Sequence, residues 1–139
     1  MNQRPQKPRI TDSSLDKLRV PPHSIEAEQS VLGGLMLDNQ AWDRIADLIA
    51  DTDFYRDEHR RIFRQIRSLL ERAKPADVVT VAEALDAAGE GDQTGGLAYL
   101  GELAANTPSA ANIKRYAEIV RERAVLRQLV ATADEIAAD

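Results

Sequence analysis

The hydrophobic pattern in the last third of the chain moves from one side of a helix to the other. From Thr107 to Asp139 there is no glycine, and Pro108 is the only proline. Thr107-Pro108 therefore predicts a helix start, with a capping hydroxyl followed by a proline in the first turn. The first apolar stripe at helical spacing consists of Ile113, Tyr116, Ala117, Val120 and Ala124. The second stripe lies on roughly the opposite side and consists of Val125, Leu126, Leu129, Val130, Ala133, Ile136 and Ala137.

The length of this segment leaves two arrangements open. A straight helix over it runs about 45–50 Å, whereas a globule built from the rest of the chain is about 35 Å across. The second half therefore either turns at a kink near residues 121–123 or projects beyond its domain with an uncovered apolar face. Such a face needs a partner. Because the chain ends inside the pattern without a capping signal, we expect it to be a piece of a longer protein.

The composition favours an all-α fold with an aliphatic core. Only 4% of the 139 residues are aromatic, and there is no cysteine, which excludes a disulfide framework and a thiolate metal site. This length corresponds to one domain. No run of 18 apolar residues occurs, and the N-terminus has no apolar signal core. We therefore expect a soluble, cytoplasmic protein with no membrane association.

Charge is distributed unevenly along the chain. Residues 1–23 carry five Lys or Arg against two Asp, a net +3, whereas residues 24–139 carry 13 basic against 21 acidic residues, a net −8. Residues 1–20 are predicted to form a disordered basic tail, because they contain too little apolar surface to offset the entropy of ordering. The acidic body argues against broad binding to nucleic-acid phosphates.

Residues 21–120 are predicted to form a compact bundle of about six helices, which the long C-terminal helix completes. Ser24 follows two prolines and is a natural N-cap, with Glu26 and Glu28 in the first turn, where the helix dipole favours anions. Gly33-Gly34 lies inside this first helix, at a cost of about 1 kcal/mol per glycine relative to alanine. We expect a close helix–helix crossing there.

Further helices follow from the spacing of apolar residues. Trp42, Ile45, Leu48 and Ile49 predict a short helix, and Phe54-Tyr55 is expected to anchor a loop in the core. A longer helix opens at Asp57, with a buried stripe of Ile62, Phe63, Ile66, Leu69, Leu70 and Ala73. Thr80 and Glu83 match a capping box, and Gly89 marks the end of that helix. The last short helix of the body carries Leu97, Leu100, Leu103 and Ala104. Leu97 and Tyr99 flank its entry and are candidates for reaching the surface.

Enzyme chemistry finds no support in the sequence. A Walker-type nucleotide loop needs a Lys-Ser/Thr pair after its glycines, and no such pair follows Gly33-Gly34 or the glycine-rich turn at residues 90–96. His23 and His59 are the only histidines, so a metal site is not expected, and His59 is interpreted as a satisfied residue at the core edge. We expect no catalytic residue, no cofactor and no metal in this chain.

The helix that opens at Asp57 carries a row of arginines opposite its apolar stripe, namely Arg60, Arg61, Arg64, Arg67 and Arg72. One interpretation is a basic ridge for DNA or for an acidic partner. The favoured interpretation is an ordinary solvated face, bridged to neighbouring acids.

Several runs of residues resemble one known family. They are VPPHSIEAEQSVLGGLMLD at 20–38, DFY at 53–55, HRRIF at 59–63, VTVAE at 79–83, GGLAYL at 95–100, NTPSAANI at 106–113 and IVRER at 119–123. The first run and NTPSAANI are long and unusual, which makes the match specific. On these runs the chain resembles the N-terminal domain of the bacterial replicative helicases of the DnaB type, over about residues 20–138.

The resemblance implies a role in assembly. Proteins of that family have an N-terminal helical domain, a linker and a RecA-like ATPase domain that uses ATP and Mg²⁺ to unwind DNA at the fork. Their N-terminal domains pair through a helical hairpin, form a collar on the hexamer and receive primase. The first hairpin helix would correspond to about Val125–Asp139, so residues 121–139 would be the start of a hairpin or linker helix, truncated before the ATPase domain.

The resulting hypothesis is a non-catalytic interaction module. The expected partners are a second copy of the chain and the C-terminal domain of primase, with a helicase loader as a further candidate. The candidate contact residues are Leu97, Tyr99, Val125, Leu126, Leu129, Val130, Ala133 and Ile136. The alternative is a helical nucleic-acid-binding domain that uses the basic surface of Arg60, Arg61, Arg64 and Arg67, although DNA contact is not expected.

Overall fold

A computed structural model describes residues 20–138, and the predicted basic tail lies outside these residues except for Val20. The described residues contain helices and no strands, so the all-α prediction is confirmed. In chain order the elements are α2 (Ile25–Leu37), η1 (Asn39–Ala41), α3 (Trp42–Ile45), η2 (Asp51–Asp53), α4 (Asp57–Glu71), α5 (Val78–Ala87), α6 (Gly91–Thr94), α7 (Gly96–Asn106) and α8 (Ile113–Ala138).

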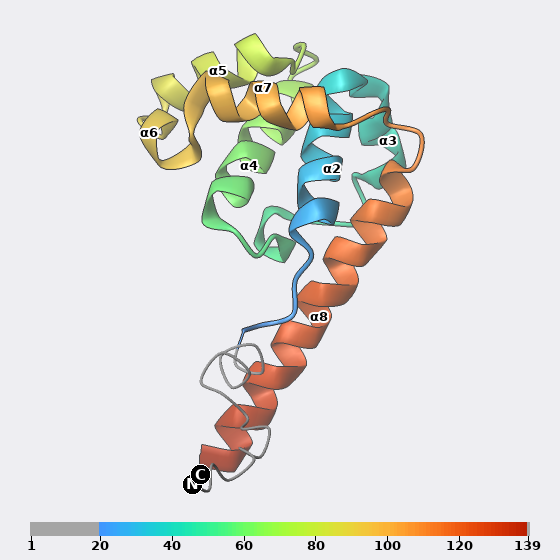
Figure 1. Cartoon of the computed structure of the whole chain (residues 1–139), viewed down its shortest axis with the longest axis vertical. Coiled ribbons are helices and arrows are strands. Elements are labelled where there is room, and N and C mark those ends of the chain that lie inside the picture. The colour runs from blue at the N-terminus through green and yellow to red at the C-terminus, as the bar shows by residue number, and fades with distance from the viewer. Residues whose placement is uncertain (1–19, 139) are drawn as a thin grey trace, which may run out of the picture.

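Helix α2 is the centre of the bundle. Ser24 caps it as predicted, because its hydroxyl accepts a hydrogen bond from the Ala27 backbone at 3.2 Å. α2 packs against α7, α8 and α4, and Figure 1 shows α4 and α8 on either side of it, with α7 crossing one end. Its apolar residues Val31, Leu32 and Leu35 are completely buried. The positions of α4, α7 and α8 are therefore set by their packing on α2.

The glycine pair in α2 permits the close crossing that the sequence predicts. A Cβ added at Gly33 would overlap the Thr107 hydroxyl and come within 2.5 Å of the Leu103 carbonyl oxygen, at the end of α7. A Cβ at Gly34 would lie 3.2 Å from the Ile113 side chain, at the start of α8. The absence of side chains at Gly33 and Gly34 thus lets α7 and α8 approach the backbone of α2 closely.

The predicted helix start at Thr107 is wrong. Thr107 is the C-cap of α7, and its hydroxyl donates backwards to the Leu103 carbonyl at 2.8 Å. The residue before a proline is disfavoured in the helical region, and Thr107 is extended (φ −96°, ψ 113°). α8 therefore begins only at Ile113, after a loop.

Other helix boundaries also differ from the sequence-based prediction. α5 begins at Val78, not at Thr80, because the carboxylate of Asp77 accepts from the Thr80 backbone and the Thr80 hydroxyl accepts from the Asp77 backbone. Asp77 is the N-cap and Thr80 the third residue of the helix, so Asp77 takes the capping position that Thr80 was expected to hold. α3 ends at Ile45, so Leu48 and Ile49 follow the helix, although Ile49 is still buried.

The C-terminal ends of α4 and α5 use the same backbone motif with different residues. Gly89 follows α5 with φ +73°, as its prediction as a C-terminal stop requires. Ala73 holds the equivalent position after α4 with φ +56° and is exposed, so its placement in the buried stripe is wrong. The reason is that the chain turns back at this point, with Lys74 N–H bonded to the Leu69 carbonyl at 2.8 Å.

Candidate association surface

Helix α8 is continuous from Ile113 to Ala138, so the chain projects and does not turn at residues 121–123. Figure 1 shows its far half extending away from the bundle. In the near half, Ile113, Ala117 and Val120 are at most 1% exposed. The body therefore covers one stripe of the helix and stops near Ala124, which is half-buried.

The far half of α8 carries an uncovered apolar face, here called the distal face. Among residues 20–138 the large hydrophobic side chains that are exposed number nine. Five of these nine belong to α8, namely Val125, Leu126, Leu129, Val130 and Ile136. Ala133 and Ala137 are exposed beside them. The prediction that this stripe faces away from its own core is confirmed.

The distal face has the spacing of a helix-pairing seam. Leu126, Leu129, Ala133 and Ile136 follow one another at intervals of three, four and three residues. That is the spacing of the a and d positions of a coiled coil, which keeps an apolar seam turned toward a neighbouring helix. Leu129 is 60% and Ile136 71% exposed. The geometry therefore suits a second helix laid along α8.

A small cluster joins the root of this projecting segment to the body. The Arg127 guanidinium donates to the carbonyl oxygens of Pro22 at 2.8 Å and Asp53 at 2.6 Å. Its carbon lies 5.5 Å from the centre of the Tyr55 ring, on which the His23 ring also stacks, with the two ring centres 4.1 Å apart. Burial lowers the pKa of Arg127, and the Glu28 carboxylate opposes that shift.

A buried polar network lies at the centre of the body. Glu28 is 1% exposed and accepts hydrogen bonds from His59 Nδ1 and from the Tyr55 backbone, both at 2.7 Å. The other ring nitrogen of His59 lies 2.6 Å from the Tyr99 hydroxyl. Because Gln29 donates to that hydroxyl at 3.2 Å, the hydroxyl proton is available to His59 Nε2. His59 is therefore a satisfied residue, and it is fully buried, deeper than the core-edge position expected for it.

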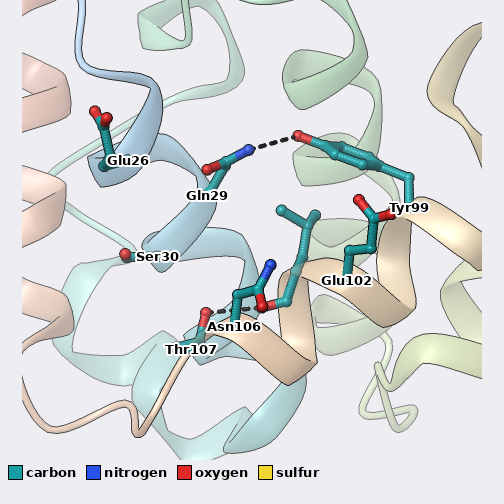
Figure 2. Close-up of a pocket in the computed structure, with 8 residues that line it drawn as sticks. Glu26, Gln29, Ser30, Tyr99, Glu102, Asn106 and Thr107 are labelled. Carbon is teal, nitrogen blue, oxygen red and sulfur yellow. Dashed lines mark hydrogen bonds between the residues drawn. The ribbon is translucent and has the colours of Figure 1, made fainter.

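Tyr99 also lines a polar pocket between α2 and α7. Figure 2 shows Glu26, Gln29 and Ser30 on one side of it, and Tyr99 with Glu102 on the other. The pocket measures about 170 Å³, which is below the usual range for small-molecule sites, about 300–1,000 Å³. Burial raises the pKa of the Tyr99 hydroxyl, while its hydrogen bond with Gln29 acts in the opposite direction.

The comparisons with known proteins agree with one another. The DnaB-like helicase N-terminal domain family matches residues 20–122. This chain belongs to that family. It is 48% identical to the replicative DNA helicase DnaB of Haemophilus influenzae over 127 residues, which cover 91% of this chain and 27% of that protein. With DnaB of Geobacillus stearothermophilus it shares 45% identity over 91% of this chain and 28% of that protein.

Solved structures confirm the fold of the DnaB N-terminal domain. The crystal structure of this domain of the Mycobacterium tuberculosis DnaB helicase matches with a TM-score of 0.83 and 41% identity, over 86% of this chain and 83% of that chain. A DnaB-like replicative helicase, whose structure was described with its interactions with primase, matches with a TM-score of 0.71 and 24% identity, over 83% of this chain and 27% of that one. The chain thus spans about a quarter of the length of the whole DnaB proteins that it matches.

The two candidate contact residues of α7 lie away from the distal face. Leu97 is 56% exposed, whereas Tyr99 is half-buried and held by His59 and Gln29. α7 crosses the end of the bundle that is remote from the free end of α8 (Figure 1). The candidate residues therefore form two separate groups, of which only the α8 group is a continuous apolar surface.

The arginines of α4 are engaged by neighbouring groups. Arg61 lies 2.8 Å from Asp57 and 2.7 Å from Glu90, and its hydrogen bond holds the pKa of Asp57 below the usual value. Both Arg64 and Arg67 face Asp51, at 3.1 and 3.6 Å. Arg60 donates to the Phe54 carbonyl at 2.7 Å. This is the arrangement expected of a solvated face bridged to nearby acids.

Sequence reasoning missed the buried role of Glu28. Its position in the first turn of α2 predicts only a favourable interaction with the helix dipole. A usable signal was present, since Glu28 lies on the same side of the helix as Val31, Leu32 and Leu35 at intervals of three, four and seven residues. Such an acid on an apolar stripe needs a partner, and His59 is that partner.

Within residues 20–138, no cluster of three or more His, Cys, Asp or Glu side chains has a geometry that would hold a metal ion. In the same part of the chain, no helix has both the length and the apolar content needed to cross a bilayer.

Proposed function

We propose that this chain is the non-catalytic collar domain of a replicative helicase, which joins subunits of the ring to one another and recruits primase. The observation that carries this proposal is the distal face of α8, a seam of coiled-coil spacing that the body leaves uncovered. Membership of the DnaB family supplies the context in which such a face has a use.

The width of the distal face supports assembly with more than one neighbouring helix. When Leu126 and Leu129 are assigned to the core positions a and d of a heptad, Val125 and Val130 fall on the flanking positions g and e. Those positions usually carry charged residues in a two-stranded coiled coil, but here both are aliphatic and exposed. A single partner helix would cover the seam and leave these valines at its edges.

The size of the face suits reversible association. Covering one half-exposed aliphatic side chain gives about 1 kcal/mol, so five such residues on each of two copies give about 10 kcal/mol. Association itself costs about 4–15 kcal/mol in lost translational and rotational freedom. The two quantities nearly balance, so we expect pairing of this chain to depend on its concentration.

The chemistry of unwinding is assigned to other parts of the whole protein. We propose that ATP and Mg²⁺ are bound by an ATPase domain of the RecA-like type, that a helicase loader is a further partner, and that the protein acts in the cytoplasm. This chain is assigned no catalytic residue, cofactor or metal. Its contribution is to hold subunits and primase in place, which requires a rigid body and an adhesive surface.

Calorimetric titration with the C-terminal domain of a cognate primase tests the recruiting role. The matched pair of variants is Leu129→Asp and Val79→Asp, because Leu129 is 60% and Val79 59% exposed and both are on helices. We expect Val79→Asp to bind as the unchanged chain does, and Leu129→Asp to bind at least tenfold more weakly, a loss of about 1.4 kcal/mol. The recruiting role would be refuted if the unchanged chain gave no heat of binding, or if both variants bound equally.

A further inference from the structure

Among residues 20–138, Arg127 is the residue beyond Ala124 through which α8 is hydrogen-bonded to the body. Its two terminal nitrogens donate to the carbonyl oxygens of Pro22 and Asp53, at 2.8 and 2.6 Å. These acceptors belong to two different segments, one entering α2 and the other ending η2. Its guanidinium also lies over the Tyr55 ring. One side chain of α8 therefore contacts three separate points of the body.

Two of the three groups that hold Arg127, Asp53 and Tyr55, are themselves bonded to the body. Asp53 is 5% exposed, and its carboxylate accepts from the Ala50 backbone and from Arg121 of α8, both at 2.8 Å. The backbone of Tyr55 donates to the buried carboxylate of Glu28 at 2.7 Å. The contacts of Arg127 with Asp53 and Tyr55 thus end on residues that are bonded to the body, so they can transmit a fixed position to α8.

The location of Arg127 along the helix gives it leverage. Over residues 113–137 of α8, the last fully buried residue is Val120, and Arg127 lies about 10 Å farther along the helix axis. The end of α8 lies about 16 Å beyond Arg127. If the body contacted α8 only up to Val120, a small tilt of the helix axis at that point would displace the far end of the distal face several times farther than it displaces the residues next to Val120. A second fixed point at Arg127 limits that tilt.

We infer that Arg127 is a positioning residue, which fixes the direction and rotation of the projecting half of α8 relative to the body. The distal face is thereby presented in one orientation, before any partner arrives, and a pre-oriented surface loses less entropy on binding. This inference deepens the proposed function, on which its biological meaning rests. The mechanical statement concerns the single chain and is tested on the single chain.

The planar fork of an arginine is what this position uses. A guanidinium donates to two separate carbonyl groups at once and stacks on an aromatic ring, whereas a lysine ammonium acts as a single point charge on a flexible stem. We therefore expect Arg127→Lys to keep the charge but to hold α8 less firmly than arginine does. Arg127→Ala removes all of these contacts.

Distance measurement by pulsed electron spin resonance tests the inference. The chain has no cysteine, so Glu83→Cys on α5 and Asp134→Cys on the far half of α8 give two unique labelling sites, both exposed. All samples carry Leu126→Asp and Leu129→Asp and are diluted with unlabelled protein, so that pairing of the distal face does not contribute. A failure of self-association would therefore leave this measurement unaffected.

The inference predicts a graded result. We expect one narrow distance distribution for the parent, at least a doubling of its width for Arg127→Ala, and an intermediate width for Arg127→Lys. The control is Arg115→Ala, since Arg115 pairs with Glu122 of the same helix, and it should leave the width unchanged. Helix content by circular dichroism should be the same in all four proteins. An unchanged width in Arg127→Ala, or equal broadening in Arg115→Ala, would overturn the inference.

Discussion

The two halves of α8 have the same secondary structure and opposite surroundings. In the near half, Ile113, Ala117 and Val120 fill the core beside α2, whereas in the far half Leu126 is 44% and Leu129 60% exposed. No glycine or proline separates the halves. The difference between them therefore lies in what each half packs against.

This contrast separates two uses of apolar surface. Burial of the near stripe stabilises the domain itself, because its side chains leave water when the chain folds. The distal face gains nothing of that kind from folding, and its apolar surface becomes useful only when another molecule covers it. Substitutions in the two halves should accordingly affect different measurements.

The largest expected effect is a difference in the free energy of unfolding between a substitution in the near half of α8 and one in the far half. Ile113→Ala should lower the free energy of unfolding by about 3 kcal/mol, because it leaves a cavity beside α2. Leu129→Ala should change it by no more than about 0.5 kcal/mol, as for most exposed residues. Urea denaturation at low protein concentration measures both. Equal losses for the two variants would mean that the distal face is part of the domain core.

The second effect uses glycines to test how tightly the body is packed. Gly33→Ala should lower the free energy of unfolding by about 2–3 kcal/mol, because the new methyl group would overlap Thr107 and the Leu103 carbonyl. Gly101 on α7 has no atom within 4 Å of an added Cβ, so Gly101→Ala should raise the free energy by about 1 kcal/mol. Thermal unfolding of the two variants gives the sign of each change in the free energy of unfolding. A neutral Gly33→Ala would contradict the close crossing.

The third effect concerns the buried polar network of Glu28, His59 and Tyr99. The distal face is apolar and has no such network. Tyr99→Phe leaves the ring nitrogen of His59 without its hydroxyl partner and should lower the free energy of unfolding by about 1–2 kcal/mol. Tyr116→Phe is the control and should be close to neutral.

The same tyrosine should also give a pH dependence. Burial raises the pKa of Tyr99 above its ordinary value of 10.0, so folding favours the neutral hydroxyl. The stabilisation is therefore complete below pH 10 and is lost as the pH rises through the folded-state value. The difference in unfolding free energy between the unchanged chain and Tyr99→Phe should shrink over that range. A constant difference at all pH values would contradict this role of the hydroxyl.

The smallest effect lies at the helix ends of the body. Ala73 adopts a left-handed conformation that strains any residue with a Cβ, so Ala73→Gly should raise the free energy of unfolding by about 1 kcal/mol. Gly89→Ala makes the opposite change in the same motif after α5 and should lower it by about 1 kcal/mol. Thermal unfolding measures both changes in the free energy of unfolding. Opposite signs would support the left-handed conformation at both positions, and equal signs would refute it.

Local patterns in the sequence were sufficient for much of this structure. The cap at Ser24, the start of α4 at Asp57 and the exposure of Leu126 and Leu129 each follow from a few neighbouring residues. The choice between a kinked and a straight α8 did not follow from the pattern. A change of stripe looks the same in both cases, and the contacts that hold the straight helix come from residues far away in the chain, such as Asp53.

The polar contacts that the sequence did not predict share a physical reason. Glu28, His59 and Tyr99 come from three different helices and meet only in the folded domain. Thr107 has the features of a helix cap, but its hydroxyl is used by the preceding helix, where Gly33 leaves room for it. In each case the role of a polar side chain depends on a distant partner that local spacing does not reveal.

The most direct test of the account is the mass of the chain in solution over a range of concentrations, measured by light scattering. If the distal face joins one copy to another, the mass should rise above that of a 15.4 kDa monomer as the concentration increases. Leu126→Asp with Leu129→Asp should remain at the monomer mass, and Val79→Asp should behave as the unchanged chain does. A mass that is independent of concentration, or a rise that the double variant retains, would contradict the claim that the distal face is an association surface.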